Sequence, residues 1–167
     1  LTGLLQPTSG DILINGQPVV VDSPSKSDSL GIGMVHQHFM LIDAFTVTEN
    51  IVLGSEITKG LSLDTKTAAK KIQSLSDQYG LAVNPMAKIS DISVGQQQRV
   101  EILKTLYRGA DILIFDEPTA VLTPQEIDEL IAFMRNLAKD GKSIILITQE
   151  LVDIRSAADL VTVIRAG

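Results

Sequence analysis

The sequence predicts an α/β fold in which helices connect the strands of a parallel sheet. The apolar runs 112–116 and 143–148 have the length and composition of strands buried on both faces. Between them, residues 124–140 carry apolar side chains at helical spacing. Two strands joined by a helix pair in parallel, because the helix returns the chain to the starting edge of the sheet. A further apolar run at 160–164 predicts a third strand.

The beginning of the chain predicts a helix end and three short strands. Residues 1–5 look like the end of a helix. Asn15-Gly16 is a strong hairpin signal, which joins a strand at 11–16 to a return strand at 19–22. Residues 31–37 form an apolar run bracketed by glycines, which predicts another strand.

Residues 46–107 predict three helices. The first starts at 46–53 behind a threonine cap, the second spans 64–79 and ends at Gly80, and the third spans 96–107. Residues 84–92 are polar and contain a proline, so we expect a loop there.

The helix after the 112–116 strand has a clear start signal. Thr123 is suited to the N-cap and Pro124 to the first helical position, and Glu126 completes a capping box. Gly141 marks the end of this helix.

Composition limits the class of protein. At 167 residues the chain suits one domain with a hydrophobic core. The formal net charge of −6 disfavours nucleic acid as a partner, since phosphate binding needs a basic face. The chain has no cysteine, and no apolar run reaches the roughly 18–20 residues of a membrane helix. It begins with Leu1 rather than Met, so we expect a fragment that lost its beginning.

Asp116 and Glu117 are the first candidate site. They follow a buried strand, where parallel sheets bind ligands. Asp116 could hold Mg²⁺, and Glu117 could orient and deprotonate an attacking water. The alternative is a pair of solvated acids in a turn, which we consider weaker here because of the apolar strand that precedes them.

Three other polar positions are candidates. Gln37 ends the 31–37 strand and could ligate a metal or hold a water, while Gln149 follows the 143–148 strand and could reach a terminal phosphate. Ser93 and Gly95 precede a helix, whose N-terminus favours anions. The alternatives are an ordinary helix cap for Ser93 and a polar loop residue for Gln149.

These segments, in this order, resemble the ATP-binding subunit of an ABC transporter. Gln37 resembles the family's Q-loop, "ILIFDEP" (112–118) resembles its Walker B strand with Glu117 as the catalytic base, and Gln149 stands where the switch loop normally offers histidine. Its signature loop, usually L-S-G-G-Q, is resembled by Ser93, Val94, Gly95 and Gln96. Within the family the wording looks most like the ATPases of simple-sugar and nucleoside importers.

The resemblance implies a P-loop NTPase-type fold that here lacks its first strands and its P-loop, which would lie upstream of Leu1. It implies an ATP-binding core at 1–39 and 96–167 and a helical subdomain at 40–95. Mg-ATP would bind between two ATPase subunits, with Asp116 and Gln37 near the metal. The chain alone would then be inactive.

The resemblance also implies membrane permease subunits and, indirectly, a solute-binding protein as partners at the cytoplasmic face of the cell membrane. Two other functions stay open. The first is a hydrolysis-impaired regulatory or docking module, because of Gln149. The second is an ABC ATPase of translation or DNA repair, which the acidic balance disfavours.

Overall fold

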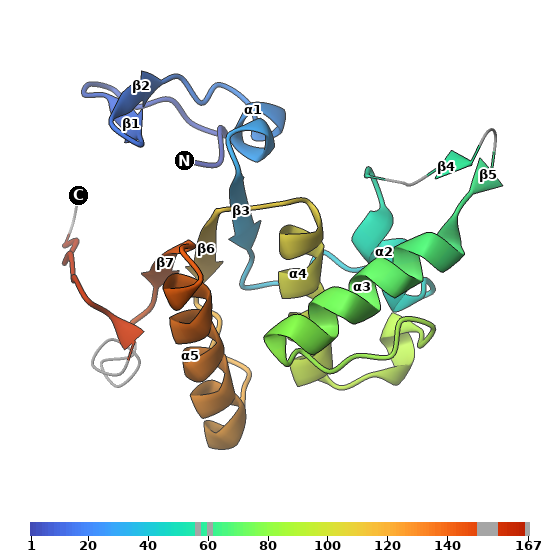
Figure 1. The fold of residues 1–167 in the computed structure, drawn as a ribbon. Coiled ribbons are helices and arrows are strands. Elements are labelled where there is room, and N and C mark those ends of the chain that lie inside the picture. The colour runs from blue at the N-terminus through green and yellow to red at the C-terminus, as the bar shows by residue number, and fades with distance from the viewer. Residues whose placement is uncertain (56–57, 60–61, 150–156, 166–167) are drawn as a thin grey trace.

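A three-stranded parallel sheet occupies the centre of the protein (Figure 1). In the computed structural model, which describes residues 1–55, 58–59, 62–149 and 157–165, its strands are arranged in the order β3-β6-β7. These are β3 (Ile32–Val35), β6 (Ile112–Asp116) and β7 (Ser143–Ile147), and helix α5 (Pro124–Lys139) connects the last two. The predicted α/β fold with parallel pairing is therefore confirmed.

The strands of the sheet differ in burial. In the middle strand β6, Leu113, Ile114 and Phe115 are all buried, as the unbroken apolar run predicts. The prediction of full burial is wrong for β7, where Ile145 and Ile147 are exposed. Among the described strands β7 pairs only with β6, and α5 packs against it, so only alternate residues reach the core.

A group of helices lies beside the sheet (Figure 1). It contains α2 (Val47–Val52), α3 (Thr65–Tyr79), the short 3-10 helix η1 (Ile89–Asp91) and α4 (Val94–Tyr107). Buried residues of these helices and of the sheet form one continuous core. The helix predicted at 96–107 begins two residues earlier, and the loop predicted at 84–92 contains η1. Between α2 and α3, β4 (Thr58–Lys59) pairs with β5 (Ser62–Leu63).

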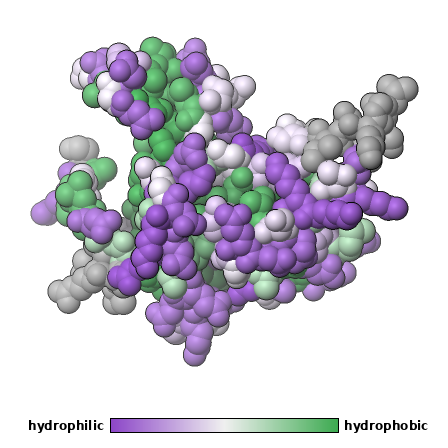
Figure 2. Space-filling model, viewed as in Figure 1, coloured by the Kyte–Doolittle hydropathy of each residue, from purple (hydrophilic) through white to green (hydrophobic). Residues whose placement is uncertain are grey.

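A hairpin and a short helix precede β3. Strands β1 (Ile12–Ile14) and β2 (Gln17–Val19) pair antiparallel, and α1 (Pro24–Ser29) follows them. Asn15 and Gly16 both have positive φ, of 51° and 76°, as a two-residue hairpin turn of this type requires. Apolar side chains gather over this hairpin, whereas α3 and α5 present mostly hydrophilic side chains on the same face (Figure 2).

Two predicted elements are not formed. Residues 1–5 contain no helix, because Gly3 has a φ of 78°, outside the helical region. Residues 160–164 contain no strand, and Leu160, Val163 and Ile164 are more than 80% exposed. A strand gains stability from pairing, and within the described part of the chain this segment has no partner strand. In the same part of the chain no helix is long and apolar enough to cross a membrane.

Among the described helices, three begin with a capping box, in which an N-cap side chain and the residue three positions later bond to each other's backbone. The pairs are Thr46–Glu49 in α2, Ser93–Gln96 in α4 and Thr123–Glu126 in α5. The carboxylates of Glu49 and Glu126 accept hydrogen bonds from the N–H and from the hydroxyl of the threonine at the N-cap. These bonds lower the pKa of both glutamates, and the bond from the N–H has the larger effect.

We predict that Thr123→Ala lowers the free energy of unfolding by about 1 kcal/mol, because alanine leaves a backbone donor of α5 without its cap. The measurement is urea denaturation of the two proteins. The control is Ser74→Ala in the middle of α3, where no cap is lost. An equal loss in both variants would contradict the prediction.

We also predict that the two capping glutamates make stability depend on acid. Their folded-state pKa lies below the ordinary value of 4.5, so their contribution is complete above that pH and is lost as the pH falls through the folded pKa. The double variant Glu49→Gln, Glu126→Gln keeps both capping boxes but cannot titrate. The urea concentration at its unfolding midpoint should therefore decrease less steeply below pH 4.5 than that of the wild type. Equal decreases with pH in the two proteins would contradict the assignment.

Candidate functional site

The register of the parallel sheet brings Gln37 and Glu117 together. Val35 of β3 pairs with Phe115 of β6, and each candidate residue follows two positions later. On the other side, Asp116 pairs with Ile147 of β7. Because parallel strands end at the same edge, the residues after all three strands converge there.

Glu117 accepts hydrogen bonds from both candidate amides. Gln149 donates from Nε2 to Oε1 over 2.7 Å, and Gln37 donates from Nε2 to Oε2 over 3.4 Å. The carboxylate is half-buried, whereas both amide side chains are exposed. Hydrogen bonds therefore join three of the predicted site residues: Gln37, Glu117 and Gln149. We call these three, together with the adjacent Asp116, the carboxylate site.

The backbone of Glu117 has an unusual conformation. Its φ is 45°, in the left-handed region, which is rare for a residue other than glycine. Its N–H donates to the carbonyl oxygen of Ile147 over 2.8 Å. Conformations of this kind persist where the surroundings hold them in place, often at functional sites.

The chemistry of the carboxylate site fits a hard cation. Asp116 is half-buried at the end of β6 and offers carboxylate oxygens, and Gln37 has an amide oxygen besides the N–H that bonds Glu117. Oxygen ligands of these two kinds are those that Mg²⁺ takes in proteins, usually with several waters. In the described residues there is no group of three or more His, Cys, Asp or Glu side chains that could hold a metal without help.

Residues 93–96 lie at the start of α4. Ser93 is the N-cap: its hydroxyl accepts from the backbone N–H of Gln96, whose side-chain oxygen accepts from the N–H of Ser93. Val94 is 47% exposed. A Cβ on Gly95 would overlap the carboxylate of Glu126. Within the described residues, no hydrogen bond joins this turn to Gln37, Glu117 or Gln149.

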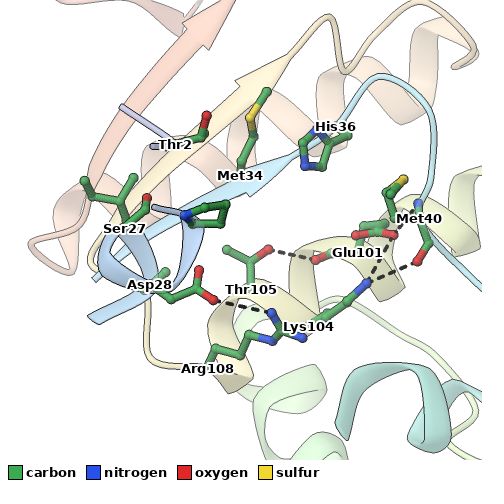
Figure 3. A pocket seen from close by; sticks show the side chains of 14 residues that line it. Thr2, Ser27, Asp28, Met34, His36, Met40, Glu101, Lys104, Thr105 and Arg108 are labelled. Atoms are coloured by element: carbon green, nitrogen blue, oxygen red, sulfur yellow. Dashed lines mark hydrogen bonds and ion pairs between the residues drawn. The ribbon is translucent and has the colours of Figure 1, made fainter. Parts of the chain in front are cut away.

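Helix α4 bonds to two of the three segments that carry the carboxylate site, a contact that the sequence did not predict. Gln98, which is buried, donates from Nε2 to the carbonyl oxygen of Pro118 over 2.7 Å. Three residues beyond Gln37, Met40 donates its N–H to Glu101 over 2.8 Å and accepts from Lys104 over 3.2 Å (Figure 3). The available signal was the presence of polar residues among the apolar positions of 96–107.

A cavity of about 270 Å³ lies between β3, α1 and α4 (Figure 3). Its wall includes Gly33, where a Cβ would overlap the side chain of Thr105, so β3 and α4 approach closely there. Arg108 and Asp28, also in the wall, approach to 3.7 Å. The four residues of the carboxylate site do not line this cavity, but Met40, three residues after Gln37, is in its wall.

Curated proteins resemble the chain over its whole length. It is 70% identical to the nucleoside import ATP-binding protein NupA of Lactococcus lactis subsp. cremoris and 62% identical to the guanosine import ATP-binding protein NupO of Bacillus subtilis. In both comparisons all of this chain is covered and 33% of the relative, so the chain spans about a third of the length of these relatives.

Solved structures share the fold. CbiO1 of Clostridium perfringens, part of an ABC transporter complex, is 27% identical with a TM-score of 0.71, covering 89% of this chain and 59% of that one. An ATP-binding cassette of an ABC transporter in its ADP conformation has a TM-score of 0.79 at 20% identity, covering 95% of this chain and 66% of that one. The family model described as ABC transporter matches residues 1–120. Because this match spans more than half of the residues, the chain belongs to the ABC transporter family.

Proposed function

We propose that this chain is part of the ATP-hydrolysing subunit that powers an ABC importer. The observation that carries the proposal is the carboxylate of Glu117, held between the amides of Gln37 and Gln149 at the edge of a parallel sheet. Family membership supports ATP as the substrate. The alternative of translation or DNA repair is disfavoured by the formal net charge of −6, since phosphate binding needs a basic face.

In this mechanism Glu117 is the general base. It accepts a proton from the water that attacks the γ-phosphate of ATP, and the bond between the β,γ-bridging oxygen and the γ-phosphorus breaks to give ADP and phosphate. Gln37 and Gln149 keep the carboxylate in one orientation through their N–H groups. The left-handed backbone of Glu117 directs its side chain toward both amides.

Mg²⁺ would be held by Asp116, through water or directly, and by the amide oxygen of Gln37. The ion would neutralise charge that develops on the phosphates. Asp116 and Gln37 would contribute the oxygen ligands, and Glu117 directly follows Asp116 in the chain.

The turn at 93–96 would act on a second nucleotide. Helix α4 is 14 residues long, and the N–H groups at its start favour an anion. Because this turn has no hydrogen bond to the carboxylate site within the described residues, we propose that it caps the ATP of a second ATPase subunit. The division into a core, 1–39 and 96–167, and a helical subdomain, 40–95, belongs to the same proposal, with the sheet in the first and α2 and α3 in the second.

The proposed partners follow from this role. They are a second ATPase subunit or tandem half, membrane permease subunits and, indirectly, a solute-binding protein, with the chain on the cytoplasmic face of the cell membrane. A nucleoside is the favoured solute and a sugar the alternative, because the relatives at 70% and 62% identity are named for nucleoside and guanosine import.

The experiment uses the full-length protein that contains this chain, reconstituted with its permease in vesicles. ATP-dependent uptake of a radiolabelled nucleoside, with no uptake of ribose or glucose, is the expected result. Uptake of a sugar and of no nucleoside would show that a sugar is the solute. Uptake that does not depend on ATP would overturn the proposed role.

A second candidate is a hydrolysis-impaired module. It is favoured by the direct contact of Gln149 with Glu117 over 2.7 Å, because a neutral amide there cannot carry a positive charge toward the transferring phosphate. The two candidates differ in the ATPase rate of the full-length protein.

We predict that Glu117→Gln in the full-length protein abolishes turnover and preserves ATP binding, because the amide keeps the shape of the side chain and loses the base. Phosphate release and nucleotide binding are measured together. Asp128→Asn, the same chemical change on the exposed face of α5, should leave both unchanged. A Glu117→Gln protein that keeps most of its phosphate release would show that Glu117 is not the base.

We predict that Gln149→His raises the ATPase rate of the full-length protein at saturating Mg-ATP. A charge-capable donor at this position should stabilise the transition state, and single groups of this kind are worth about a hundredfold to a thousandfold in rate. A rise of about tenfold or more, with little change in nucleotide affinity, is expected. Gln73→His on the exposed face of α3 is the control. An unchanged rate would rule out the hydrolysis-impaired module.

A further inference from the structure

We propose that Gln98 is a positioning residue that fixes the backbone beside Glu117 and thereby aims its carboxylate. The inference rests on the proposed function, in which Glu117 is the base. Gln98 lies in the second turn of α4, is 3% exposed, and donates from its side-chain amide to the carbonyl oxygen of Pro118 over 2.7 Å.

The segment around Glu117 is anchored on both sides. On one side, the N–H of Glu117 donates to the carbonyl oxygen of Ile147 in β7. On the other side, the carbonyl oxygen of Pro118 accepts from Gln98. The proline ring locks one of the torsions between these anchors, so few soft torsions remain. Two fixed ends and a locked torsion can therefore hold Glu117 at its φ of 45°, a conformation that is otherwise unfavourable.

Proline makes the side-chain bond especially important. Pro118 has no N–H, so it cannot donate a hydrogen bond that would help to fix this stretch. The carbonyl oxygen of Pro118 can still accept a hydrogen bond, and Gln98 of α4 donates one to it. Loss of that donor would leave a buried acceptor without its partner and would release the carbonyl of Pro118, one residue after Glu117.

The same helix also fixes the partner of Glu117. Glu101, one turn beyond Gln98, accepts from the N–H of Met40, and Lys104 donates to the carbonyl of Met40. Met40 lies three residues after Gln37. Helix α4 therefore sets the positions of both sides of the Gln37–Glu117 contact, and the Gln98 bond is the part of this arrangement that acts on the base.

A purely structural role for Gln98 predicts a different result from a positioning role. If the bond only stabilises the fold, its loss lowers stability and leaves the turnover of the folded protein unchanged. If it aims Glu117, its loss lowers kcat, because a misplacement of about 1 Å at a reacting group can cost about a hundredfold. The affinity for ATP should change little, because the side-chain amide of Gln98 bonds to Pro118, which follows the base, and not to a residue of the carboxylate site.

The test uses three variants of the full-length protein. Gln98→Met removes the donor and keeps the length of the side chain, while Gln98→His offers an Nε2–H at a similar reach. Ser76→Ala is the matched control, because it removes another buried hydrogen bond from a side chain to a carbonyl, that of Ser76 to Leu81 over 2.8 Å, far from Glu117 in the sequence.

We expect Gln98→Met to lower kcat by at least about tenfold with KM for ATP within about twofold of the wild type. Gln98→His should recover part of that loss, and Ser76→Ala should lose stability with kcat unchanged. The inference is overturned if Gln98→Met keeps full kcat, or if Ser76→Ala loses as much turnover as Gln98→Met.

Amide hydrogen exchange separates this inference from the proposed function. In Gln98→Met, peptides covering 113–122 should exchange faster than in the wild type, whereas in Ser76→Ala they should not. Unchanged exchange there overturns the positioning role whatever the ATPase rate. If the wild-type protein hydrolyses no ATP, the proposed function fails and the catalytic part of the inference fails with it, while exchange still decides whether Gln98 holds the segment.

Discussion

The parallel pairing of β6 with β3 on one side and with β7 on the other sets the position of every side chain in the carboxylate site. In the observed register, Phe115 of β6 pairs with Val35 of β3 and with Leu146 of β7, and all three side chains pack in the same core. In that register the chain leaves the sheet at Gln37, Glu117 and Gln149 together. A carboxylate and two amides from distant parts of the sequence therefore meet without any local motif that joins them.

Helix α4 is the second element on which the site depends, because it connects regions with different roles. Its first turn carries the residues predicted to form the signature loop. Its second turn bonds to the carbonyl of Pro118, one residue after Glu117, and its third turn bonds to the backbone of Met40, three residues after Gln37. Polar side chains in the buried face of a helix usually lower stability unless each finds a partner. Here Gln98 bonds to the backbone of Pro118 and Glu101 bonds to the backbone of Met40. The buried polar side chains therefore position the segments that follow Glu117 and Gln37.

The groups that orient Glu117 are neutral. Gln37 and Gln149 are exposed amides, and each gives one hydrogen bond to the carboxylate. None of the four residues of the carboxylate site has a positive side chain, so charge that develops on a transferred phosphate would have to be met by groups outside these four. This is the physical reason that the role of Gln149 separates an active ATPase from a hydrolysis-impaired one.

Local patterns in the sequence determined the elements that depend on neighbouring residues. They include the capping box at Thr123, the hairpin turn at Asn15-Gly16 and the end of α3 at Gly80, since each arises from bonds or conformations within a few residues. Only the tertiary structure decided whether the apolar segments 143–148 and 160–164 are covered: β7 has an exposed face and residues 160–164 form no strand, because burial and strand pairing require partners from elsewhere in the chain. The contact of Gln98 with Pro118 was undetermined for the same reason, as a hydrogen bond across 20 residues exists only once α4 and β6 have packed together.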